Sequence, residues 1–225
     1  SNPAPFASWL NLADYGWAIA SASPERLMRL ESGIVSTRPI KGTRPRGKSD
    51  SDDSNLRLEL ASSEKEMAEH LMLVDLERHD LASVCKKGSV NWSECRIEAL
   101  ANVQHLVSGV EGELSPNTSV GKSLASLFPG GSNTGCPKVV TMSAIDELEG
   151  SPRSAWTGSI GHINQSSGQS DWNILIRTME ARSGPDSWFA TVQAGGGVVI
   201  DSNPAAEVEE ARWKAAAVAE ATWGF

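Results

Sequence analysis

The chain has 225 residues, of which 40% are apolar and 21% are charged, and its formal net charge at pH 7 is −8. This length suits one large domain and the apolar content suffices for a buried core, which excludes an intrinsically disordered chain. A negative charge without a basic stripe argues against nucleic acid as a partner, although a locally positive pocket can still bind a small anion.

Cysteine usage and hydropathy bear on the compartment. The three cysteines have no metal-ligand spacing, and their odd number argues against a disulfide framework. No stretch approaches the roughly 18 apolar residues of a membrane span, and the first residues do not resemble a signal peptide. We therefore expect a cytoplasmic protein with reduced thiols and no membrane partner.

The first half of the chain is predicted to contain two strands and a long helix. Residues 17–21 and 33–37 are rich in branched side chains and bounded by turn formers, as is typical of strands. A tight corner is expected at residues 23–26, and the polar stretch 44–55 is expected to be an exposed loop. From residue 64 to 86 the pattern changes to a helical period, which predicts an amphipathic helix. Its apolar face is predicted to carry Met67, Leu71, Val74 and Leu81.

The second half of the chain is predicted to contain both helices and several short strands. Helices are predicted at residues 118–127 and 138–149, and a last helix is predicted to start at Pro204 with Asn203 as its N-cap. Strands are predicted at four segments: residues 155–163, 172–178, 188–193 and 198–200. The short turns among the first three indicate an antiparallel meander, so we expect an α+β fold of layered antiparallel sheets with outer helices.

Three familiar motifs are absent. The stretch 120–123 resembles the end of a phosphate-binding loop, but its first glycine would have to stand at Pro116. The run 195–197 is not a dinucleotide fingerprint, and a close approach of backbone to packing or ligand explains its glycines better. The histidines lack the spacing of a zinc hydrolase.

Lys41 and Glu25 are the candidate chemical groups of the first half. Lys41 follows apolar Ile40 at the end of a predicted strand, and burial would lower the pKa of its amine and make it a nucleophile or base. A surface lysine in a basic loop is the alternative. A closed pocket would raise the pKa of Glu25 enough for proton donation near neutral pH, while a glutamate starting a helix is the alternative.

Carboxylates on two predicted helices are candidate metal ligands. Glu69 lies on the long helix, and Glu207 and Glu210 lie on the last helix with Lys214 on the same face. Oxygen ligands of this kind suit Mg²⁺ if they converge in space. Taken singly, each glutamate also reads as a solvated helix residue.

Read together, several segments resemble the chorismate-utilising enzymes, which include anthranilate synthase component I, aminodeoxychorismate synthase component I, isochorismate synthase and salicylate synthase. The matching segments follow the family's order over nearly the whole chain: SASPER at 21–26, TRPIKGTRPRG at 37–47, EKEMAEHLMLVDLERHDL at 64–81, VQHLVSGVEGEL at 103–114, FPGGSNTGCPK at 128–138, IDELEGSPRSAWTGSIG at 145–161, ILIRT at 174–178 and QAGGGVVIDSNPAAEVEEARWKA at 193–215.

The choice within the family depends on Lys41. The PIKGT sequence resembles aminodeoxychorismate synthase component I, whereas anthranilate synthases typically carry a small residue at this position. The resemblance implies that Lys41 attacks ring carbon 2 of chorismate while Glu25 protonates the departing 4-hydroxyl. Ammonia then enters at carbon 4 and expels the lysine, a transaminase-type amination that leads to p-aminobenzoate and folate.

The resemblance also implies the remaining site residues. Glu69 and Glu210, supported by Glu207, would hold Mg²⁺, which orients the ring carboxylate. Arg177 would bind the carboxylate of the enolpyruvyl group. Further substrate-binding groups would be Thr43, the amides around Gly195 and Gly196, and Lys214. His105 would lie near the ring and assist positioning or proton transfer.

The implied partners are chorismate and a glutamine amidotransferase subunit that supplies ammonia. The whole chain, residues 1–225, is interpreted as the C-terminal part of one chorismate-binding catalytic domain. Because it opens on Ser1 without an initiator Met, we expect an N-terminally truncated fragment. Anthranilate synthase component I and a non-catalytic chorismate-binding fragment are the alternative functions.

Overall fold

The computed structural model describes residues 4–101 and 103–224. The chain divides into two compact units, and each one gathers segments that are distant in the sequence. Unit 1 comprises Ser1–Pro24, Ser151–Ile160 and Ile174–Phe225, and unit 2 comprises Glu25–Gly150 and Gly161–Asn173. No described helix combines the length and apolarity that spanning a membrane demands.

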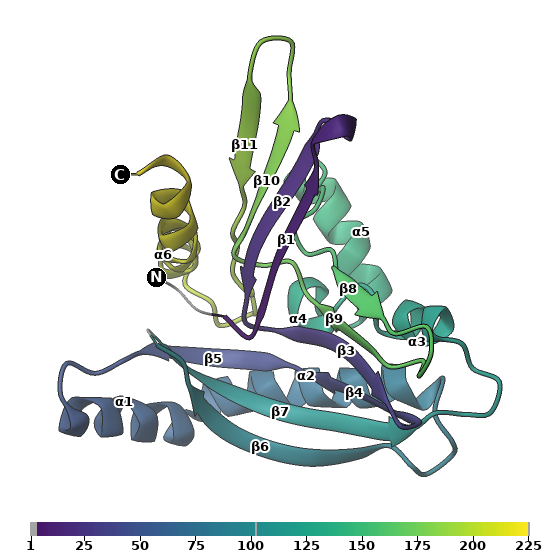
Figure 1. Cartoon of the computed structure of the whole chain (residues 1–225). Helices are drawn as coiled ribbons and strands as arrows, with labels where there is room; N and C mark the ends of the chain where they lie inside the picture. Colours follow the sequence, from purple (N-terminus) through teal and green to yellow (C-terminus); the bar gives the residue numbers. More distant parts are fainter. Residues whose placement is uncertain (1–3, 102, 225) are drawn as a thin grey trace. The chain divides into compact units, whose positions relative to one another are not determined.

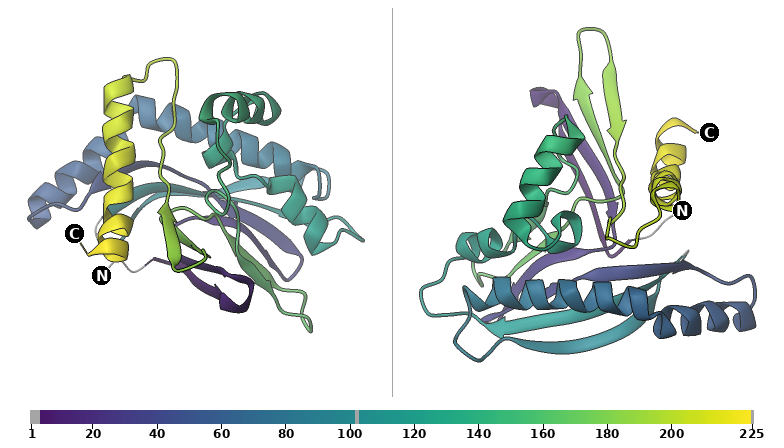
Figure 2. Two further views of the ribbon diagram at one scale, coloured as in Figure 1. Left: turned by 90° about the horizontal axis from the view of Figure 1, so that it is seen from above. Right: turned by 180° about the vertical axis from the view of Figure 1, so that it is seen from behind.

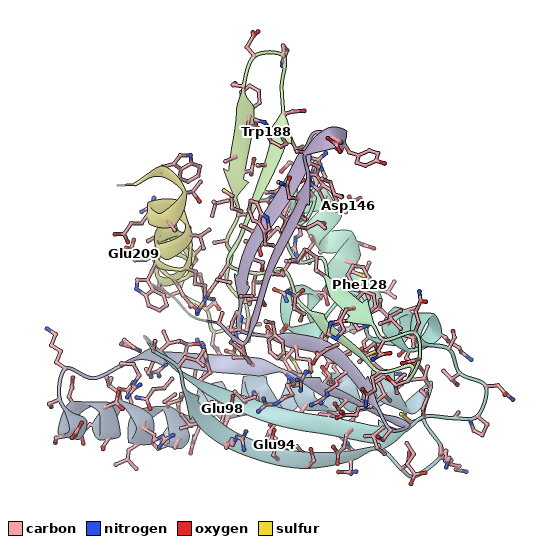
Figure 3. All side chains as sticks on the ribbon, viewed as in Figure 1. Glu94, Glu98, Phe128, Asp146, Trp188 and Glu209 are labelled. Carbon is pink, nitrogen blue, oxygen red and sulfur yellow. The ribbon has the colours of Figure 1, made fainter. Side chains whose placement is uncertain are left out.

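Unit 1 is a four-stranded antiparallel sheet with one long helix (Figure 1). The strand order is β1-β2-β10-β11, with strands at Phe6–Leu12, Trp17–Ser23, Thr178–Ser183 and Trp188–Val192. A 3₁₀ turn, η1, spans Ala13–Tyr15, and helix α6 spans Pro204–Trp223. Ile19, Ala155 and Leu175 form the buried core of this unit. Figure 3 shows Trp188 on the β10–β11 hairpin and Glu209 on α6.

Unit 2 is built on a seven-stranded antiparallel sheet of order β5-β7-β4-β3-β9-β8, with β6 paired to β7. Its strands are β3 Arg26–Glu31, β4 Ile34–Arg38, β5 Ile40–Pro45, β6 Asn91–Ala99, β7 Val103–Glu113, β8 Gly161–Ile163 and β9 Ser170–Asn173. Its helices are α1 Asp50–Ser62, α2 Glu64–Ala82, α3 Val120–Leu127, α4 Gly131–Thr134 and α5 Lys138–Glu149. Helices α1 and α2 follow one another along one face of this sheet (Figure 2).

The predicted fold class is confirmed, because every strand pair is antiparallel and helices cover a sheet. The local predictions that rested on capping chemistry also agree with the structure. Helix α6 begins at Pro204, and the Asn203 side chain accepts a hydrogen bond from the backbone N–H of Ala206.

The prediction of an exposed loop over residues 44–55 is wrong. Strand β5 continues to Pro45, and α1 begins at Asp50. The hydroxyl of Ser49 caps this helix by accepting a hydrogen bond from the backbone N–H of Asp52 at 3.2 Å. Acidic side chains in the first turn complement the helix dipole, so the polar composition that resembled a loop instead starts a helix.

Ser49→Ala removes the α1 cap, and we expect it to lower the free energy of unfolding by about 1 kcal/mol, because one backbone N–H loses its partner. Denaturant titration of both proteins measures the change. Ser54→Ala on the same helix is the control, since its hydroxyl donates to the carbonyl of Asp50 and caps no N–H. Equal losses in the two variants would contradict the cap assignment.

The predicted meander is confirmed in two antiparallel pairs, β8 with β9 and β10 with β11, but it is wrong as one continuous sheet. Only Gly161–Ile163 of the segment 155–163 is a strand, and the segment 172–178 is interrupted between β9 and β10. These two strands join different sheets, because β9 pairs with β3 and β10 pairs with β2. Two backbone hydrogen bonds replace the strand ladder at the interruption. The N–H of Thr157 donates to the carbonyl of Leu175, and the N–H of Leu175 donates to the carbonyl of Gly158.

Residues 198–200 do not form the predicted strand. Val198 and Ile200 are exposed, and the Ser202 hydroxyl accepts the N–H of Val199 within a turn that leads into α6. Branched residues alone therefore do not make a strand where no neighbouring edge is available.

Helix α2 is confirmed, but its buried face is rotated from the predicted one and it ends at Ala82 instead of residue 86. Leu71 is 41% exposed, although Val74 and Leu81 are buried as predicted. The buried face includes His70 and Glu77, two polar residues that an apolar pattern does not count.

Candidate active site

Strand β5 carries Lys41 beside a bulge. The pairing of β5 with β7 shifts register between Ile40 and Thr43, and Gly42 adopts φ +86° within the shift. A Cβ at Gly42 would also come within 3.0 Å of Leu60 Cδ1. Glycine therefore meets both the backbone and the packing requirement of this bulge, which sets the direction of its neighbours.

Helix α2 places Glu69 against Lys41. The Lys41 Nζ lies 2.6 Å from Glu69 Oε2, and the two side chains are 27% and 11% exposed. Lys65 approaches the other oxygen of Glu69 at 3.9 Å. The amine of Lys41 is thus held in one direction by a half-buried ion pair between β5 and α2.

Glu25 lies at the corner before β3 and is buried, with 4% of its surface exposed. Its Oε1 accepts a hydrogen bond of 3.4 Å from the backbone N–H of Ile40, the residue before Lys41. No helix follows this corner, since β3 begins at Arg26, so Glu25 does not start a helix. The buried carboxyl of Glu25 therefore contacts the backbone of β5 one residue before Lys41.

Thr43 and His105 extend the same cluster. The Thr43 hydroxyl and His105 Nδ1 are 2.8 Å apart, and the two residues are directly paired across β5 and β7. His105 is buried. Unit 2 thus brings five of the predicted site residues to β5 and its neighbours: Lys41, Glu25, Glu69, Thr43 and His105.

Unit 1 brings together a second group at α6 and the glycine-rich loop. Lys214 Nζ lies 2.7 Å from Glu210 Oε1 and donates to the carbonyl of Gly195 at 3.4 Å. A Cβ on Gly196 would come within 2.9 Å of Glu207 Oε2. The predicted residues Gly195, Gly196, Glu207, Glu210 and Lys214 therefore lie within reach of one another.

Arg177 is a partly buried cation with a strained backbone. Its φ is +50°, which a non-glycine residue adopts only where the surrounding structure imposes it, and its carbonyl accepts the N–H of Ala22. Burial lowers the pKa of its guanidinium from the ordinary value. The described residues give the guanidinium no ion-pair partner, so a bound anion would supply the missing charge.

The magnesium assignment stays a prediction. Glu69 belongs to unit 2, whereas Glu207 and Glu210 belong to unit 1. Within residues 4–101 and 103–224, no group of three or more histidine, cysteine or acidic side chains is arranged to hold a metal ion. The chemistry of the predicted donors fits Mg²⁺, since all are carboxylates. In this structure Glu69 is paired with Lys41 and Glu210 with Lys214.

Two buried ionisable residues of α2 were missed. His70 Nε2 lies 2.6 Å from the Ser108 hydroxyl, and burial lowers its pKa to about 4. Glu77 accepts the N–H of Gly131, and burial raises its pKa to about 8. A signal for Glu77 does exist in the sequence, because it lies three residues after Val74 and four before Leu81, on the apolar side of the helix.

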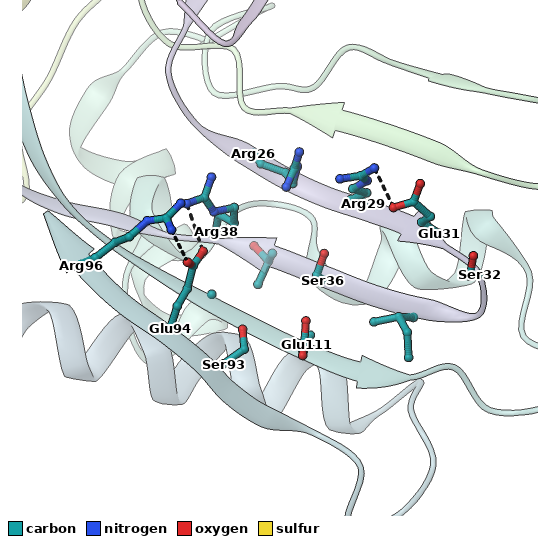
Figure 4. Close-up of a pocket in the computed structure, with 13 residues that line it drawn as sticks. Arg26, Arg29, Glu31, Ser32, Ser36, Arg38, Ser93, Glu94, Arg96 and Glu111 are labelled. Carbon is teal, nitrogen blue, oxygen red and sulfur yellow. Dashed lines mark ion pairs between the residues drawn. The ribbon is translucent and has the colours of Figure 1, made fainter. Parts of the chain in front are cut away.

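A separate polar cavity of about 500 Å³ opens on the sheet of unit 2 (Figure 4). Strands β3, β4, β6 and β7 contribute its charged lining. The arginines of the cavity are ion-paired: Arg26 with Asp171 at 3.1 Å, Arg29 with Glu31 at 2.6 Å, Arg38 with Glu94 at 3.0 Å and Arg96 with Glu94 at 3.2 Å. Acidic side chains already neutralise the arginines of this cavity, whereas the guanidinium of Arg177 has no ion-pair partner among the described residues.

Comparisons with known proteins identify the family of the chain. The pattern of the family described as "chorismate binding enzyme" matches residues 1–220. An anthranilate synthase component I-like protein of Synechocystis is 47% identical over 100% of this chain and 45% of its own length. Aminodeoxychorismate synthase component 1 of Bacillus subtilis is 44% identical over 98% of this chain and 46% of its own length.

A solved structure of similar fold has a related name. Anthranilate synthase component I from Streptococcus pneumoniae superposes with a TM-score of 0.85 at 35% identity, over 96% of this chain and 46% of that structure. The chain thus spans about half the length of the relatives it matches. On this evidence the chain belongs to the chorismate binding enzyme family.

Proposed function

We propose that the complete protein converts chorismate and ammonia to 4-amino-4-deoxychorismate. The observation that carries the proposal is Lys41 on the β5 bulge, with its amine 2.6 Å from Glu69 and with Glu25 bonded to the preceding amide. Relatives named as aminodeoxychorismate synthase and as anthranilate synthase are similarly identical to the chain, so the choice between the two activities rests on Lys41.

In the proposed reaction, the neutral amine of Lys41 forms a bond to ring carbon 2 of chorismate. Both ring double bonds then shift, from carbons 1 and 2 to carbons 1 and 6 and from carbons 5 and 6 to carbons 4 and 5, and the bond from carbon 4 to its hydroxyl breaks. Glu25 gives its proton to the departing hydroxyl, which leaves as water. Ammonia then bonds to carbon 4 and expels Lys41, while Glu25 takes back a proton from the new ammonium group. The covalent adduct divides one difficult substitution into two easier ones.

The remaining side chains bind and orient. Arg177, a partly buried guanidinium, is assigned to the enolpyruvyl carboxylate, and the hydroxyl of Thr43 with His105 is assigned to the ring. Glu69 and Glu210, with Glu207 in support, are assigned to Mg²⁺, which when bound neutralises and orients the ring carboxylate. A glutamine amidotransferase subunit is proposed as the source of ammonia.

Product analysis tests the proposal. The complete protein, supplied with chorismate, Mg²⁺ and an ammonium salt, is expected to form aminodeoxychorismate without releasing pyruvate. Anthranilate synthase component I is the second candidate, favoured by the likeness to the Streptococcus pneumoniae enzyme. Fluorescent anthranilate accompanied by pyruvate would decide for that candidate. Absence of any turnover, with chorismate still bound, would indicate a non-catalytic chorismate-binding protein.

We expect Glu69→Gln or Glu210→Gln to raise the Mg²⁺ concentration needed for half-maximal activity by at least about tenfold, because a neutral amide is a poorer ligand for a hard cation. Magnesium titration of initial rates measures the change. Glu209→Gln is the control, since it is a neighbouring exposed glutamate of α6 that is not assigned to the metal. Unchanged titration curves for both ligand variants would remove the metal assignment.

A further inference from the structure

Glu180 on β10 is a buried carboxylate that the proposed reaction does not use, and only 7% of its surface is exposed. Its Oε1 accepts hydrogen bonds from Trp17 Nε1 at 2.8 Å and from the Ser154 hydroxyl at 3.0 Å. The same oxygen pairs with Arg182 Nη2 at 2.6 Å, and Oε2 accepts the backbone N–H of Ala155 at 3.1 Å. The carboxylate therefore ties β2 and the chain at residues 154–155 to β10.

Residues 154–158, called here the support segment, have a backbone that depends on outside contacts. Ser154 has φ +54° and Thr157 has φ +63°, in the left-handed region that residues other than glycine adopt only where the surroundings impose it. The Ser154 hydroxyl accepts from Arg182 Nη2 at 2.9 Å, which leaves its own hydrogen to donate to Glu180. Glu180 therefore holds the strained start of the support segment in place.

The support segment in turn fixes the backbone that leads into Arg177. Residues 174–177 lie between β9 and β10 and belong to neither strand, so no strand ladder holds them. Instead, the N–H of Thr157 donates to the carbonyl of Leu175, and the N–H of Leu175 donates to the carbonyl of Gly158, both at 2.8 Å. Arg177 follows two residues later with φ +50°. Its direction therefore depends on where the support segment lies.

We propose that Glu180 is a positioning residue for Arg177, acting through the support segment. The inference rests on the proposed function, in which Arg177 binds the enolpyruvyl carboxylate of chorismate. On the far side, β2 completes the hold, because the N–H of Ala22 donates to the carbonyl of Arg177 at 3.1 Å. Glu180 itself touches no substrate and transfers no proton in this role.

Displacement of Arg177 is expected to affect binding more than chemistry. A guanidinium and a carboxylate bind best as two parallel hydrogen bonds, so a small change in the direction of Arg177 loses affinity for the charged enolpyruvyl group. The groups assigned to the chemical steps, Lys41 and Glu25, belong to unit 2, whereas Glu180 and the support segment belong to unit 1. Loss of Glu180 should therefore raise the KM for chorismate and leave kcat nearly unchanged.

The first test measures kcat and KM for chorismate in the complete protein, with Mg²⁺ and saturating ammonium. Glu180→Gln keeps the length of the side chain but replaces one acceptor oxygen with an NH₂ group, which cannot accept the bonds that Glu180 receives. The KM is expected to rise about tenfold, with kcat within about twofold of wild type.

Ile19→Val is the matched control for a general loss of stability. Ile19 is paired with Glu180 across β2 and β10 and is 1% exposed, so removing one methyl group loosens the same part of the sheet without breaking the Glu180 hydrogen bonds. Its KM for chorismate is expected to equal that of wild type. The same rise in KM in Ile19→Val and Glu180→Gln would overturn the inference.

The second test identifies which group of chorismate loses its contact. The probe is the chorismate derivative whose enolpyruvyl carboxylate is a methyl ester, which lacks the charge that Arg177 would bind. Calorimetry measures the Kd of chorismate and of the ester in the complete protein carrying Lys41→Arg, which forms no adduct. Adding Glu180→Gln is expected to raise the Kd of chorismate about tenfold and to leave that of the ester within about twofold.

Ser154→Ala removes one donor to Glu180 and keeps the carboxylate. It is expected to weaken chorismate and spare the ester in the same way, with a smaller change, and it decides the question if Glu180→Gln does not fold.

Equal weakening of chorismate and its ester would overturn the inference, because Glu180 would then support unit 1 as a whole. Unchanged affinities, a fall in kcat at constant KM, or equal affinity of the Lys41→Arg protein for the two ligands would also overturn it. Absence of chorismate binding would overturn both this inference and the proposed function. The proposed function alone fails if the wild type releases anthranilate and pyruvate, and the comparison of Kd values does not depend on which product forms.

Discussion

Lys41→Ala is expected to reduce aminodeoxychorismate formation by at least about a thousandfold, because removing a covalent nucleophile leaves only binding and proton transfer to assist the reaction. Initial rates with chorismate and ammonium measure the loss. Mass spectrometry of the wild-type protein with substrate is expected to find an adduct on the peptide that contains Lys41.

Lys41→Arg is the matched control for this prediction. An arginine can keep the ion pair with Glu69, which joins β5 to α2 at 2.6 Å in the structure, but it is not a nucleophile. We expect it to unfold like wild type and yet to lack activity. Substantial activity in Lys41→Ala, together with an absent adduct, would contradict the covalent mechanism.

Glu77→Gln is expected to change how stability depends on pH. The pKa of Glu77 is raised from 4.5 to about 8 in the folded protein, which therefore retains a proton that the unfolded chain releases between these values. The stability that this proton contributes is complete below about pH 4.5 and is lost as pH rises through about 8. Over the window it falls by up to about 1.4 kcal/mol per pH unit.

The variant has no such proton, so its free energy of unfolding should exceed that of wild type by an amount that grows to about 3–5 kcal/mol at the alkaline end. Denaturant titrations of both proteins from about pH 5 to about pH 9 measure the difference. Asp75→Asn is the control, an exposed acid on the same helix that pairs with Arg78. A difference between wild type and Glu77→Gln that stays constant with pH would refute the raised pKa.

Sequence reasoning succeeded where the determinants are local. The cap formed by Asn203 and Pro204 depends on a few adjacent residues, and α5 was predicted with the bounds it has in the structure. Strand β7 was missed because nearly all of it is buried, so the alternation that identifies a strand with one solvent face is absent. Strand β6 was missed because its side chains are largely exposed and polar.

For the candidate site too, the sequence indicates the local features and not the long-range ones. Lys41, Glu25 and Glu69 could be selected from the sequence because their motifs are short and continuous. Their proximity could not be derived, since it depends on the β5 bulge and on the packing of α2 against β5. Glu77 was not selected because its raised pKa depends on burial by distant segments, such as α4, where Gly131 donates to it.

The connectivity of the chain has a genetic consequence. The polypeptide changes unit after Pro24, Gly150, Ile160 and Asn173, so neither unit is encoded by one uninterrupted stretch. A recombination breakpoint after Gly150 or Ile160 would divide both units, and one after Pro24 or Asn173 would divide unit 1, so no single breakpoint separates an intact unit 1 from an intact unit 2. The pair is therefore expected to be inherited as a single piece, in contrast to the modular shuffling seen when domains follow one another along a gene.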